Sequence, residues 1–211
     1  MEAATRQNQK PSRSPRFIMK LIFATHNQNK LKELQLLLPK SIELLSLDDV
    51  GYKEEIAETA DTLEGNAILK ARCIYEKFGE NCFADDSGLE VEILEGAPGV
   101  YSARYGGEQK SDADNNLKLL SEMEGKSDRK ACFKAVIALI LDGKEHVFEG
   151  RIDGEILPEP RGTFGFGYDP LFKPDGFQKT FAQMEITEKI KINHRARAVN
   201  KLVDFLKGLS H

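Results

Sequence analysis

Two long strand-like runs on either side of an Asp-Gly pair constrain this chain more than any other feature. They cover residues 131–141 and 145–156, and Asp142-Gly143 separates them. An Asp-Gly pair between two such runs is typical of a β-hairpin, because both residues tolerate the positive φ angles of a tight turn. The sequence therefore predicts two adjacent antiparallel strands. The longest uninterrupted apolar run, 135–141, is far shorter than the roughly 20 residues of a membrane-spanning helix.

Strands and helices alternate in the rest of the chain. The pattern predicts a strand at 21–24, a helix at 30–38, a strand at 42–47, a helix from a capping segment at 61–64 to Phe78, a strand at 82–84, a half-exposed strand at 89–93, a helix at 111–123 and a closing helix at 193–209. Early alternation followed by a hairpin favours an α/β fold with a mixed, twisted central sheet flanked by helices.

Residues 1–18 differ in composition from the rest of the chain. They carry four basic residues against one acidic residue, a net charge of +3, which leaves −7 for the remainder of a chain whose total is −4. They contain no apolar core of the kind that a signal peptide needs. We predict a disordered N-terminal extension at 1–18 and a single domain at 19–211, with a basic targeting arm as the alternative for the extension.

The acidic balance and the cysteines restrict the possible partners and compartment. A net charge of −4 does not provide the basic surface that general nucleic-acid binders use. The three cysteines, Cys73, Cys82 and Cys132, are odd in number and form no CxxC pair, which argues against a disulfide framework. We therefore expect a cytoplasmic protein that binds neither nucleic acid nor a membrane.

The first polar segment suited to chemistry is Thr-His-Asn-Gln-Asn-Lys at 25–30, between the first predicted strand and the first predicted helix. Backbone N–H groups at a helix N-terminus attract anions, and Lys30 adds a full positive charge. The segment therefore predicts a phosphate-binding turn. It is not a P-loop, because GxxxxGK[ST] is absent. The alternative is that Thr25 or Asn27 only caps the helix.

Two adjacent carboxylates, Asp85 and Asp86, follow the strand predicted at 82–84. Mg²⁺ takes one or two carboxylates and leaves its other positions to water and substrate phosphates, and one carboxylate could also deprotonate an attacking water. The alternative is an Asx turn at the end of the strand. Glu58 is a weaker candidate for another metal-facing carboxylate. Lys70 either reaches a phosphate or is a surface lysine with a buried stem.

A loop at 162–170 interleaves three glycines with three aromatic residues and ends in Asp-Pro. Glycine lets the backbone approach a flat ligand, and Phe166 or Tyr168 could stack on a base. The order of the glycines does not match the GxGxxG dinucleotide fingerprint. The alternative is a packed loop whose aromatic side chains are buried for stability.

The fourth segment combines Lys189 with Asn193-His194-Arg195 at the start of the closing helix. Cations are favoured at the C-terminus of a helix, so His194 and Arg195 in its first turn indicate an anionic or acceptor partner. The alternative is a solvated basic face. Taken together, the four segments supply the parts of a nucleotide site whose phosphates lie on Mg²⁺, whereas HExxH, GxSxG and zinc-type cysteine spacing are absent.

Six motifs with family-like spacing then indicate a resemblance. They are Thr25 to Lys30, Glu64 to Ala71 (EGNAILKA), Ala84 to Leu89 (ADDSGL), Gly96 to Tyr105 (GAPGVYSARY), Phe166 to Pro170 (FGYDP) and Asn193 to Arg195. In these motifs the chain resembles the inosine/xanthosine triphosphate pyrophosphatases over essentially all of 19–209. Each motif alone is weak, but six in order are highly specific.

The resemblance implies an activity and an architecture. The family hydrolyses deaminated purine nucleoside triphosphates (dITP, ITP, XTP and dXTP) between the α and β phosphates, which yields the monophosphate and pyrophosphate. This reaction removes deaminated purines from the nucleotide pool. The resemblance also implies two lobes around a substrate cleft, a homodimer, and Mg²⁺ as the cofactor.

The resemblance also assigns roles, motif by motif. Asp86 and Lys70 would be catalytic, with Asp86 as the general base, and Asp86, Glu58 and Asp85 would bind the metal. The substrate would contact Thr25, His26, Asn27, Gln28, Asn29, Lys30, Ser87, Phe166, Gly167, Tyr168, Asp169, Lys189, His194 and Arg195.

Base selection requires a hydrogen-bond donor opposite the purine 6-oxygen, where adenine would present a second donor and be rejected. His194 or Arg195 is the candidate donor. The family usually has Ser at the position of Asn193, and because Asn is also a good N-cap, we expect the helix start to be kept. Two alternatives are a related hydrolase acting on modified pyrimidines or methylated nucleotides, and a non-catalytic nucleotide-binding module.

Overall fold

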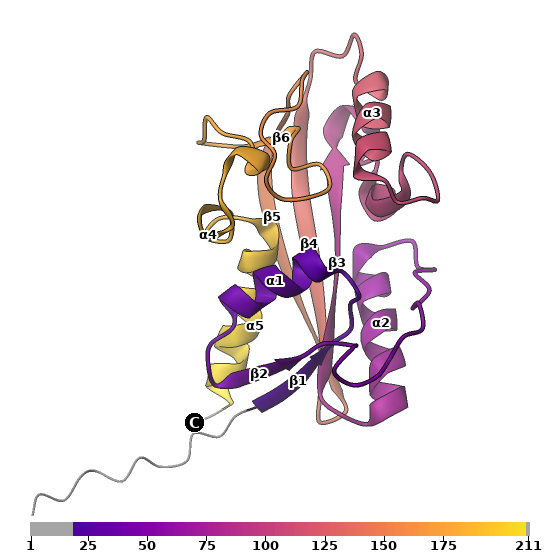
Figure 1. The fold of residues 1–211 in the computed structure, drawn as a ribbon, viewed down its shortest axis with the longest axis vertical. Coiled ribbons are helices and arrows are strands. Elements are labelled where there is room, and N and C mark those ends of the chain that lie inside the picture. Colours follow the sequence, from indigo (N-terminus) through magenta and orange to yellow (C-terminus); the bar gives the residue numbers. More distant parts are fainter. Residues whose placement is uncertain (1–18, 210–211) are drawn as a thin grey trace, which may run out of the picture.

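The computed structural model describes residues 19–209 as a six-stranded sheet with helices on both faces (Figure 1). The strand order is β2-β1-β3-β4-β5-β6; β1 runs parallel to β2 and β3, and the remaining neighbours pair antiparallel. The strands are β1 Met19–Phe23, β2 Ile42–Leu45, β3 Cys82–Val91, β4 Lys130–Leu141, β5 Lys144–Ile156 and β6 Phe172–Pro174. The predicted mixed sheet is confirmed, and the prediction for residues 1–18 lies outside the described part.

The helices are α1 Gln28–Leu37, α2 Leu63–Phe78, α3 Asp112–Glu122, α4 Ile186–Lys189 and α5 His194–Gly208, with short 3-10 turns η1 Glu92–Leu94, η2 Gly99–Arg104 and η3 Phe181–Gln183. The side chain of Asn193 caps α5 by accepting a hydrogen bond from the Ala196 N–H at 2.7 Å, so the helix start is kept as expected. No helix within residues 19–209 has the length and apolarity needed to cross a membrane.

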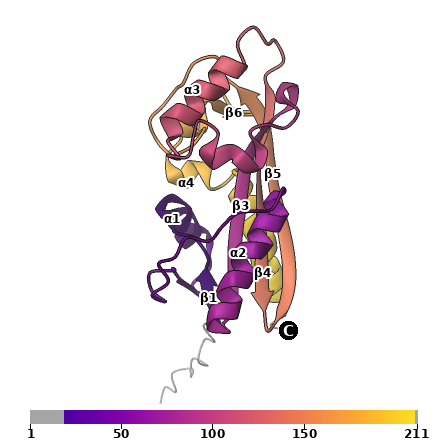
Figure 2. The ribbon, with the colours of Figure 1, turned by 90° about the vertical axis from the view of Figure 1, so that its right-hand side faces the viewer.

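The two faces of the sheet carry separate hydrophobic cores, because side chains alternate along each strand. On one face, odd-numbered residues such as Phe83 share a core with Val199 of α5. On the other face, even-numbered residues such as Ala84 share a core with Ala67 of α2. Figures 1 and 2 show α5 and α2 on opposite sides of the strands.

A third core lies at the far end of the long strands, where Leu89 packs with residues of α3, β5 and β6. Along one face of β3 the order is therefore Phe83, Asp85, Ser87 and Leu89: two polar residues between two apolar cores. The long strands run through the cores at both ends of the sheet, and each end forms one lobe. The polar residues between these cores separate the two lobes. This is the arrangement expected of two lobes around a cleft.

The main difference from the predicted elements is in β3. We expected a strand at 82–84 to stop at Asp85 and a second strand to start at Leu89, but β3 runs unbroken from Cys82 to Val91. The strand continues because β4 pairs with every residue of it, including Asp85 with Ile137 and Gly88 with Lys134. The Asx turn is therefore wrong. Apart from β3, the predicted elements have ends within two residues of those observed; β6 and α4 are too short to give a sequence pattern.

Candidate nucleotide-phosphate site

The cleft lies where β1 stops beside β3. β1 pairs with β3 only as far as Phe23 with Phe83, and the next pairing on that edge of β3 is the bridge between Glu90 and Pro98. After β1 the chain enters α1 on one face of the sheet, and after β2 it enters α2 on the other. Such a topological switch point is where open α/β sheets bind ligands. The cleft here has a volume of about 710 Å³.

Most of the residues that the sequence predicts for the site line this cleft. They are Thr25, His26, Asn27, Lys30, Glu58, Lys70, Asp86, Ser87, Phe166, Gly167, Tyr168, Asp169, Lys189, His194 and Arg195. Gln28 and Asn29 lie in the first turn of α1, and Asn29 borders a neighbouring hollow of about 330 Å³. Asp85 does not line the cleft, because its side chain is fully buried.

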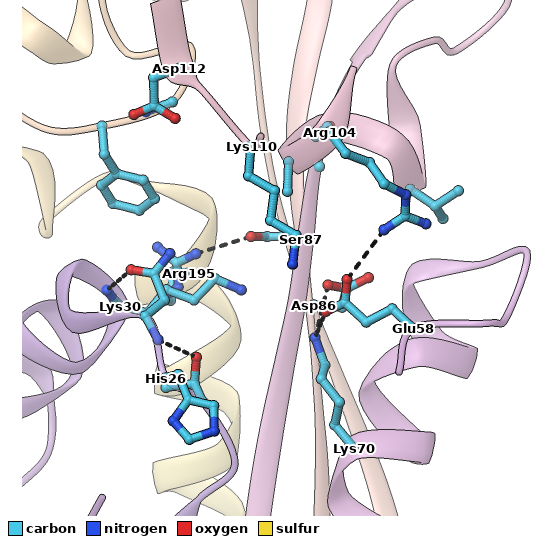
Figure 3. A pocket seen from close by; sticks show the side chains of 18 of the residues that line it. His26, Lys30, Glu58, Lys70, Asp86, Ser87, Arg104, Lys110, Asp112 and Arg195 are labelled. Atoms are coloured by element: carbon cyan, nitrogen blue, oxygen red, sulfur yellow. Dashed lines mark hydrogen bonds and ion pairs between the residues drawn. The ribbon is translucent and has the colours of Figure 1, made fainter. Parts of the chain in front are cut away.

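Asp86 faces the cleft from the α2 side of the sheet (Figure 3). The Lys70 ammonium lies 3.0 Å from Asp86 Oδ1 and 2.6 Å from Glu58 Oε1, so one cation bridges two carboxylates. Burial raises the pKa of the Asp86 carboxyl although Lys70 acts in the opposite direction. Burial alone would lower the pKa of Lys70, but Asp86 and Glu58 outweigh it and raise that pKa. With 7% of its surface exposed, Lys70 is not a surface lysine.

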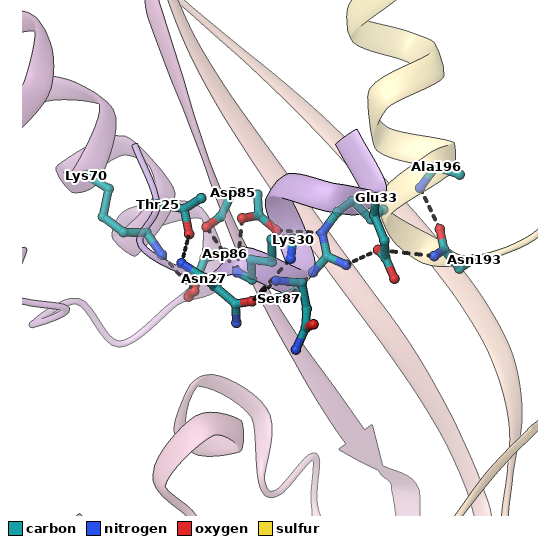
Figure 4. A network of polar contacts seen from close by, with 12 residues as sticks. Thr25, Asn27, Lys30, Glu33, Lys70, Asp85, Asp86, Ser87, Asn193 and Ala196 are labelled. Atoms are coloured by element: carbon teal, nitrogen blue, oxygen red, sulfur yellow. Dashed lines mark hydrogen bonds and ion pairs between the residues drawn. The ribbon is translucent and has the colours of Figure 1, made fainter. Parts of the chain in front are cut away.

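Asp85 points to the opposite face, toward α1 and α5 (Figure 4). Its Oδ2 accepts a hydrogen bond from Arg195 Nε at 2.9 Å, and its Oδ1 lies 3.0 Å from the Lys30 ammonium. Burial alone would raise the pKa of Asp85, but Lys30 and Arg195 hold it far below its usual value. The structure therefore does not bring Asp85 together with Glu58 and Asp86.

A buried carboxylate that the sequence motifs did not single out, Glu33 of α1, joins this network. It lies 2.5 Å from Arg195 Nη1 and 3.0 Å from the Lys189 ammonium, and 2% of its surface is exposed. The Lys189 ammonium also lies 2.6 Å from Asp169 Oδ2. Glu33 follows the segment at 25–30 by one helical turn, but in the sequence it resembles any acid on the polar side of an amphipathic helix.

Arg195 and His194 are buried rather than part of a solvated face, so that alternative is wrong for both residues. The ring of His194 stacks on Phe133 with the centroids 4.7 Å apart, and its Nδ1 has no hydrogen-bond partner among the described residues. Burial, together with the charges of Arg195 and Lys189, holds the pKa of His194 well below its usual value. The imidazole is therefore neutral at pH 7.

Two aromatic residues of the glycine-aromatic loop, Phe166 and Tyr168, line the cleft, and Tyr168 also belongs to the third core. The Lys189 ammonium lies 4.8 Å from the centroid of the Phe166 ring, which borders the cleft. Tyr168 is 3% exposed, and its hydroxyl donates to the Ser102 carbonyl at 2.9 Å. Gly165 has φ 77°, and a Cβ there would lie 2.0 Å from Asp169 Oδ2, so the turn requires glycine.

The segment at 25–30 acts as a helix cap in this structure. Asn27 Oδ1 accepts hydrogen bonds from the Asn29 and Lys30 N–H groups at 2.9 and 3.1 Å, so Asn27 is the N-cap of α1. The same geometry directs the Lys30 side chain to Asp85 and the cleft. The exposed His26 stacks on Tyr52 and pairs its Nε2 with the Glu54 carbonyl at 3.0 Å.

Within residues 19–209, no three His, Cys, Asp or Glu side chains gather into a group that could hold a metal ion. Glu58 and Asp86 nevertheless present carboxylate oxygens on either side of one positive charge at the cleft wall. A pair of carboxylates open to a cleft is the donor set that Mg²⁺ uses when water and phosphates complete its shell. These two residues, and not Asp85, therefore fit a divalent cation.

Fold and site together define an α/β protein whose cleft, at the switch point of a mixed sheet, is lined by both cations and carboxylates. Residues 21–205 match the Ham1 family, and this chain belongs to that family. The chain is 54% identical over 190 residues to a dITP/XTP pyrophosphatase of Flavobacterium psychrophilum, covering 90% of this chain and 100% of that protein. It is 47% identical over 191 residues to a dITP/XTP pyrophosphatase of Bacillus subtilis, covering 89% and 96%.

Solved structures of the family have the same fold. The Ham1 protein of Staphylococcus aureus superposes with a TM-score of 0.82 at 39% identity and covers 90% of this chain and 98% of its own. That of Coxiella burnetii superposes with a TM-score of 0.83 at 38% identity and covers 90% and 100%. The family that the sequence motifs indicated is confirmed.

Proposed function

We propose that this protein hydrolyses deaminated purine nucleoside triphosphates, dITP, ITP, XTP and dXTP, to the monophosphate and pyrophosphate. Two relatives with about half of their residues identical are dITP/XTP pyrophosphatases. The observation that carries the proposal is the carboxylate Asp86 on the cleft wall, with the Lys70 ammonium 3.0 Å away. Residues from Met19 onward act as one catalytic unit around this cleft.

The reaction is a displacement at the α phosphorus by water. The water oxygen forms a bond to the α phosphorus, the bond from that phosphorus to the bridging oxygen breaks, and pyrophosphate departs. Asp86 accepts the proton of the attacking water, since burial raises the pKa of this carboxyl and so makes it a better base. Lys70 holds Asp86 and Glu58 in position from α2.

Neutralising the charge of the triphosphate is the larger part of catalysis, because phosphoryl transfer depends on positioning and electrostatic stabilisation. Lys30, Lys70 and Lys189 supply positive charge inside the cleft. The charged side chains lining the cleft balance at six basic and six acidic residues, so they leave a bound triphosphate largely uncompensated. Mg²⁺ held by Glu58 and Asp86 would supply the missing charge and polarise the phosphoryl oxygens.

The base lies at the end of the cleft where Phe166, Lys189, His194 and Arg195 meet. Arg195 uses three of its five N–H groups on Asp85, Glu33 and Ser87, which leaves two without an acceptor in the described residues. These N–H groups or the neutral His194 ring donate to the purine 6-oxygen, and Phe166 stacks on the base. The triphosphate of the substrate contacts Thr25, Asn27 and Ser87. His26, Gln28 and Asn29 lie around the same turn as Thr25 and Asn27.

A release assay tests this function. Purified protein with Mg²⁺ is given dITP, ITP, XTP, GTP and ATP in turn, and pyrophosphate and orthophosphate are measured separately. We expect pyrophosphate from dITP, ITP and XTP far faster than from ATP. In H₂¹⁸O the label should appear in the monophosphate. Equal rates on ATP, or orthophosphate as the first product, would refute the proposal.

The same assay separates the alternatives. Turnover of modified pyrimidines or methylated nucleotides in preference to dITP would favour a related hydrolase, and tight binding without turnover would favour a binding module. We further propose a cytoplasmic homodimer without nucleic-acid or membrane partners. Sedimentation of the full chain at micromolar concentration checks the dimer, and a monomer at all concentrations would contradict it.

A further inference from the structure

Arg104, the last residue of η2, is a half-buried arginine whose guanidinium has no hydrogen-bond acceptor among the described residues. Its Nη1 lies 3.7 Å from Glu58 Oε2, and its guanidinium carbon lies 5.4 Å from the centroid of the Tyr101 ring. The other two buried or half-buried arginines of residues 19–209, Arg129 and Arg195, each donate three hydrogen bonds. A planar fork of five donors on a cleft wall is suited to binding an oxyanion bidentately.

The segment that carries Arg104 is fixed to the sheet. A Cβ on Gly88 of β3 would lie 2.3 Å from the Gly99 carbonyl oxygen, so the two backbones are in close contact. Ser102 Oγ accepts a hydrogen bond from the Leu89 N–H at 2.9 Å and donates to the Gly99 carbonyl at 2.6 Å. The side chain of Arg104 is 24% exposed and lines the cleft. Its guanidinium is therefore presented by a rigid element.

A path of ion pairs places Arg104 relative to the reacting groups. It runs from Asp86 to Lys70 at 3.0 Å, from Lys70 to Glu58 at 2.6 Å, and from Glu58 to Arg104 at 3.7 Å. Figure 3 draws Arg195 and Arg104 on opposite sides of Asp86. If the base lies toward Arg195 and the α phosphorus at Asp86, Arg104 lies on the side of the departing phosphates.

We propose that Arg104 is a further substrate-binding residue that binds the pyrophosphate part of the triphosphate. This inference rests on the proposed function for the identity of the ligand. When substrate binds, the guanidinium gives up its distant contact with Glu58 and binds two oxygens of the leaving group. Glu58 then no longer pairs with Arg104 and acts together with Asp86. Arg104 thus stabilises the negative charge that collects on pyrophosphate as the bond breaks.

The test compares Arg104→Met, Arg104→Lys and a matched control, Arg161→Gln. Arg161 is exposed, does not line the cleft, and its side chain makes no hydrogen bond in the described residues. Binding of inorganic pyrophosphate is measured by calorimetry, which needs no turnover, and inhibition of dITP hydrolysis is measured with pyrophosphate and with dIMP. For R104M we expect pyrophosphate to bind at least about tenfold more weakly while dIMP binding is unchanged, because a bidentate charged contact is lost.

R104K should fall between wild type and R104M, because it keeps the charge but not the fork. If R104M does not fold, pyrophosphate binding by R104K alone tests the role of Arg104. Unchanged pyrophosphate binding in both variants would overturn the proposal, as would equal weakening of pyrophosphate and dIMP, which is what a purely structural role through Glu58 produces. If wild type binds pyrophosphate but does not hydrolyse dITP, the proposed function fails while the calorimetric comparison still tests Arg104.

Discussion

Asp85 and Asp86 are neighbours in the chain, yet the protein uses them in opposite ways. Asp85 is sealed between α1, α5 and the sheet, where Arg195 and Lys30 keep its pKa far below the usual value. Asp86 faces the cleft, where burial raises its pKa. The difference arises because consecutive side chains of a strand point to opposite faces of the sheet. One carboxylate can thus anchor a cation while the next is available to substrate.

The contrast extends to the groups around each carboxylate. On the Asp85 side, Glu33, Arg195 and Lys189 form a closed network of buried charges at the end of the cleft where we propose that the base binds. On the Asp86 side, Lys70 and the partly exposed Glu58 leave carboxylate oxygens open to a ligand. We therefore expect substitutions on the first side to affect mainly stability and those on the second to affect mainly turnover.

The largest effect is expected for Asp86→Asn. The amide cannot accept the proton of the attacking water, so kcat should fall by about 10²–10⁴-fold. Because Lys70 keeps its contact with Glu58, thermal unfolding should stay close to that of wild type. Pyrophosphate release and a melting curve on the same preparation check both parts. Retained turnover would remove Asp86 from the role of base.

Asp85→Asn should have the opposite effect to Asp86→Asn, with a large loss of stability and a smaller loss of kcat. It leaves the buried Arg195 without one of its two carboxylates, and breaking a buried ion pair in this way costs about 3–5 kcal/mol. Urea unfolding at pH 7 measures the loss, and kcat at low temperature should fall less than in D86N. If D85N unfolds like wild type but has lost its activity, the division between the two faces is wrong.

Glu33→Gln should give a smaller and pH-dependent loss of stability. Burial alone would raise the pKa of Glu33, but Arg195 and Lys189 outweigh it and lower that pKa from its ordinary value of 4.5. A lowered folded pKa stabilises the protein above the unfolded value, and that stabilisation is lost as the pH falls through the folded value.

The free energies of unfolding of wild type and E33Q should therefore differ by about 1.5–3 kcal/mol above pH 5 and converge in acid. Urea titrations at several pH values between 3 and 7 check the sign. A difference that grows toward low pH would contradict the network.

The smallest effect is expected for Asn193→Ser, which introduces the residue that the family usually has at this position. Both residues cap a helix well, so stability should change by about 0.5 kcal/mol or less. The amide of Asn193 also reaches Glu33 Oε2, but at 3.4 Å this is a long contact. A large loss in the melting temperature would show that the Asp85 side depends on Asn193 as well.

The sequence indicated much of the fold because local patterns act within single elements. The Asp142-Gly143 pair fixed the hairpin of β4 and β5, and the helical spacing in α2 and α5 fixed two helices. The polar residues from Asp85 to Gly88 misled the prediction of β3, because they interrupt an apolar run. Pairing with β4, a contact between distant segments, keeps that stretch extended.

The sequence by itself determined most of the elements, the family and about half of the residues that line the cleft, since each depends on the order of side chains along the chain. Only the tertiary structure decided which groups meet. It placed Asp85 and Asp86 on opposite faces, brought Glu33 to Arg195 across 162 positions of sequence, and turned Arg104 toward Glu58. Partners of a buried charge are set by how helices pack on a sheet, and no local pattern encodes that geometry.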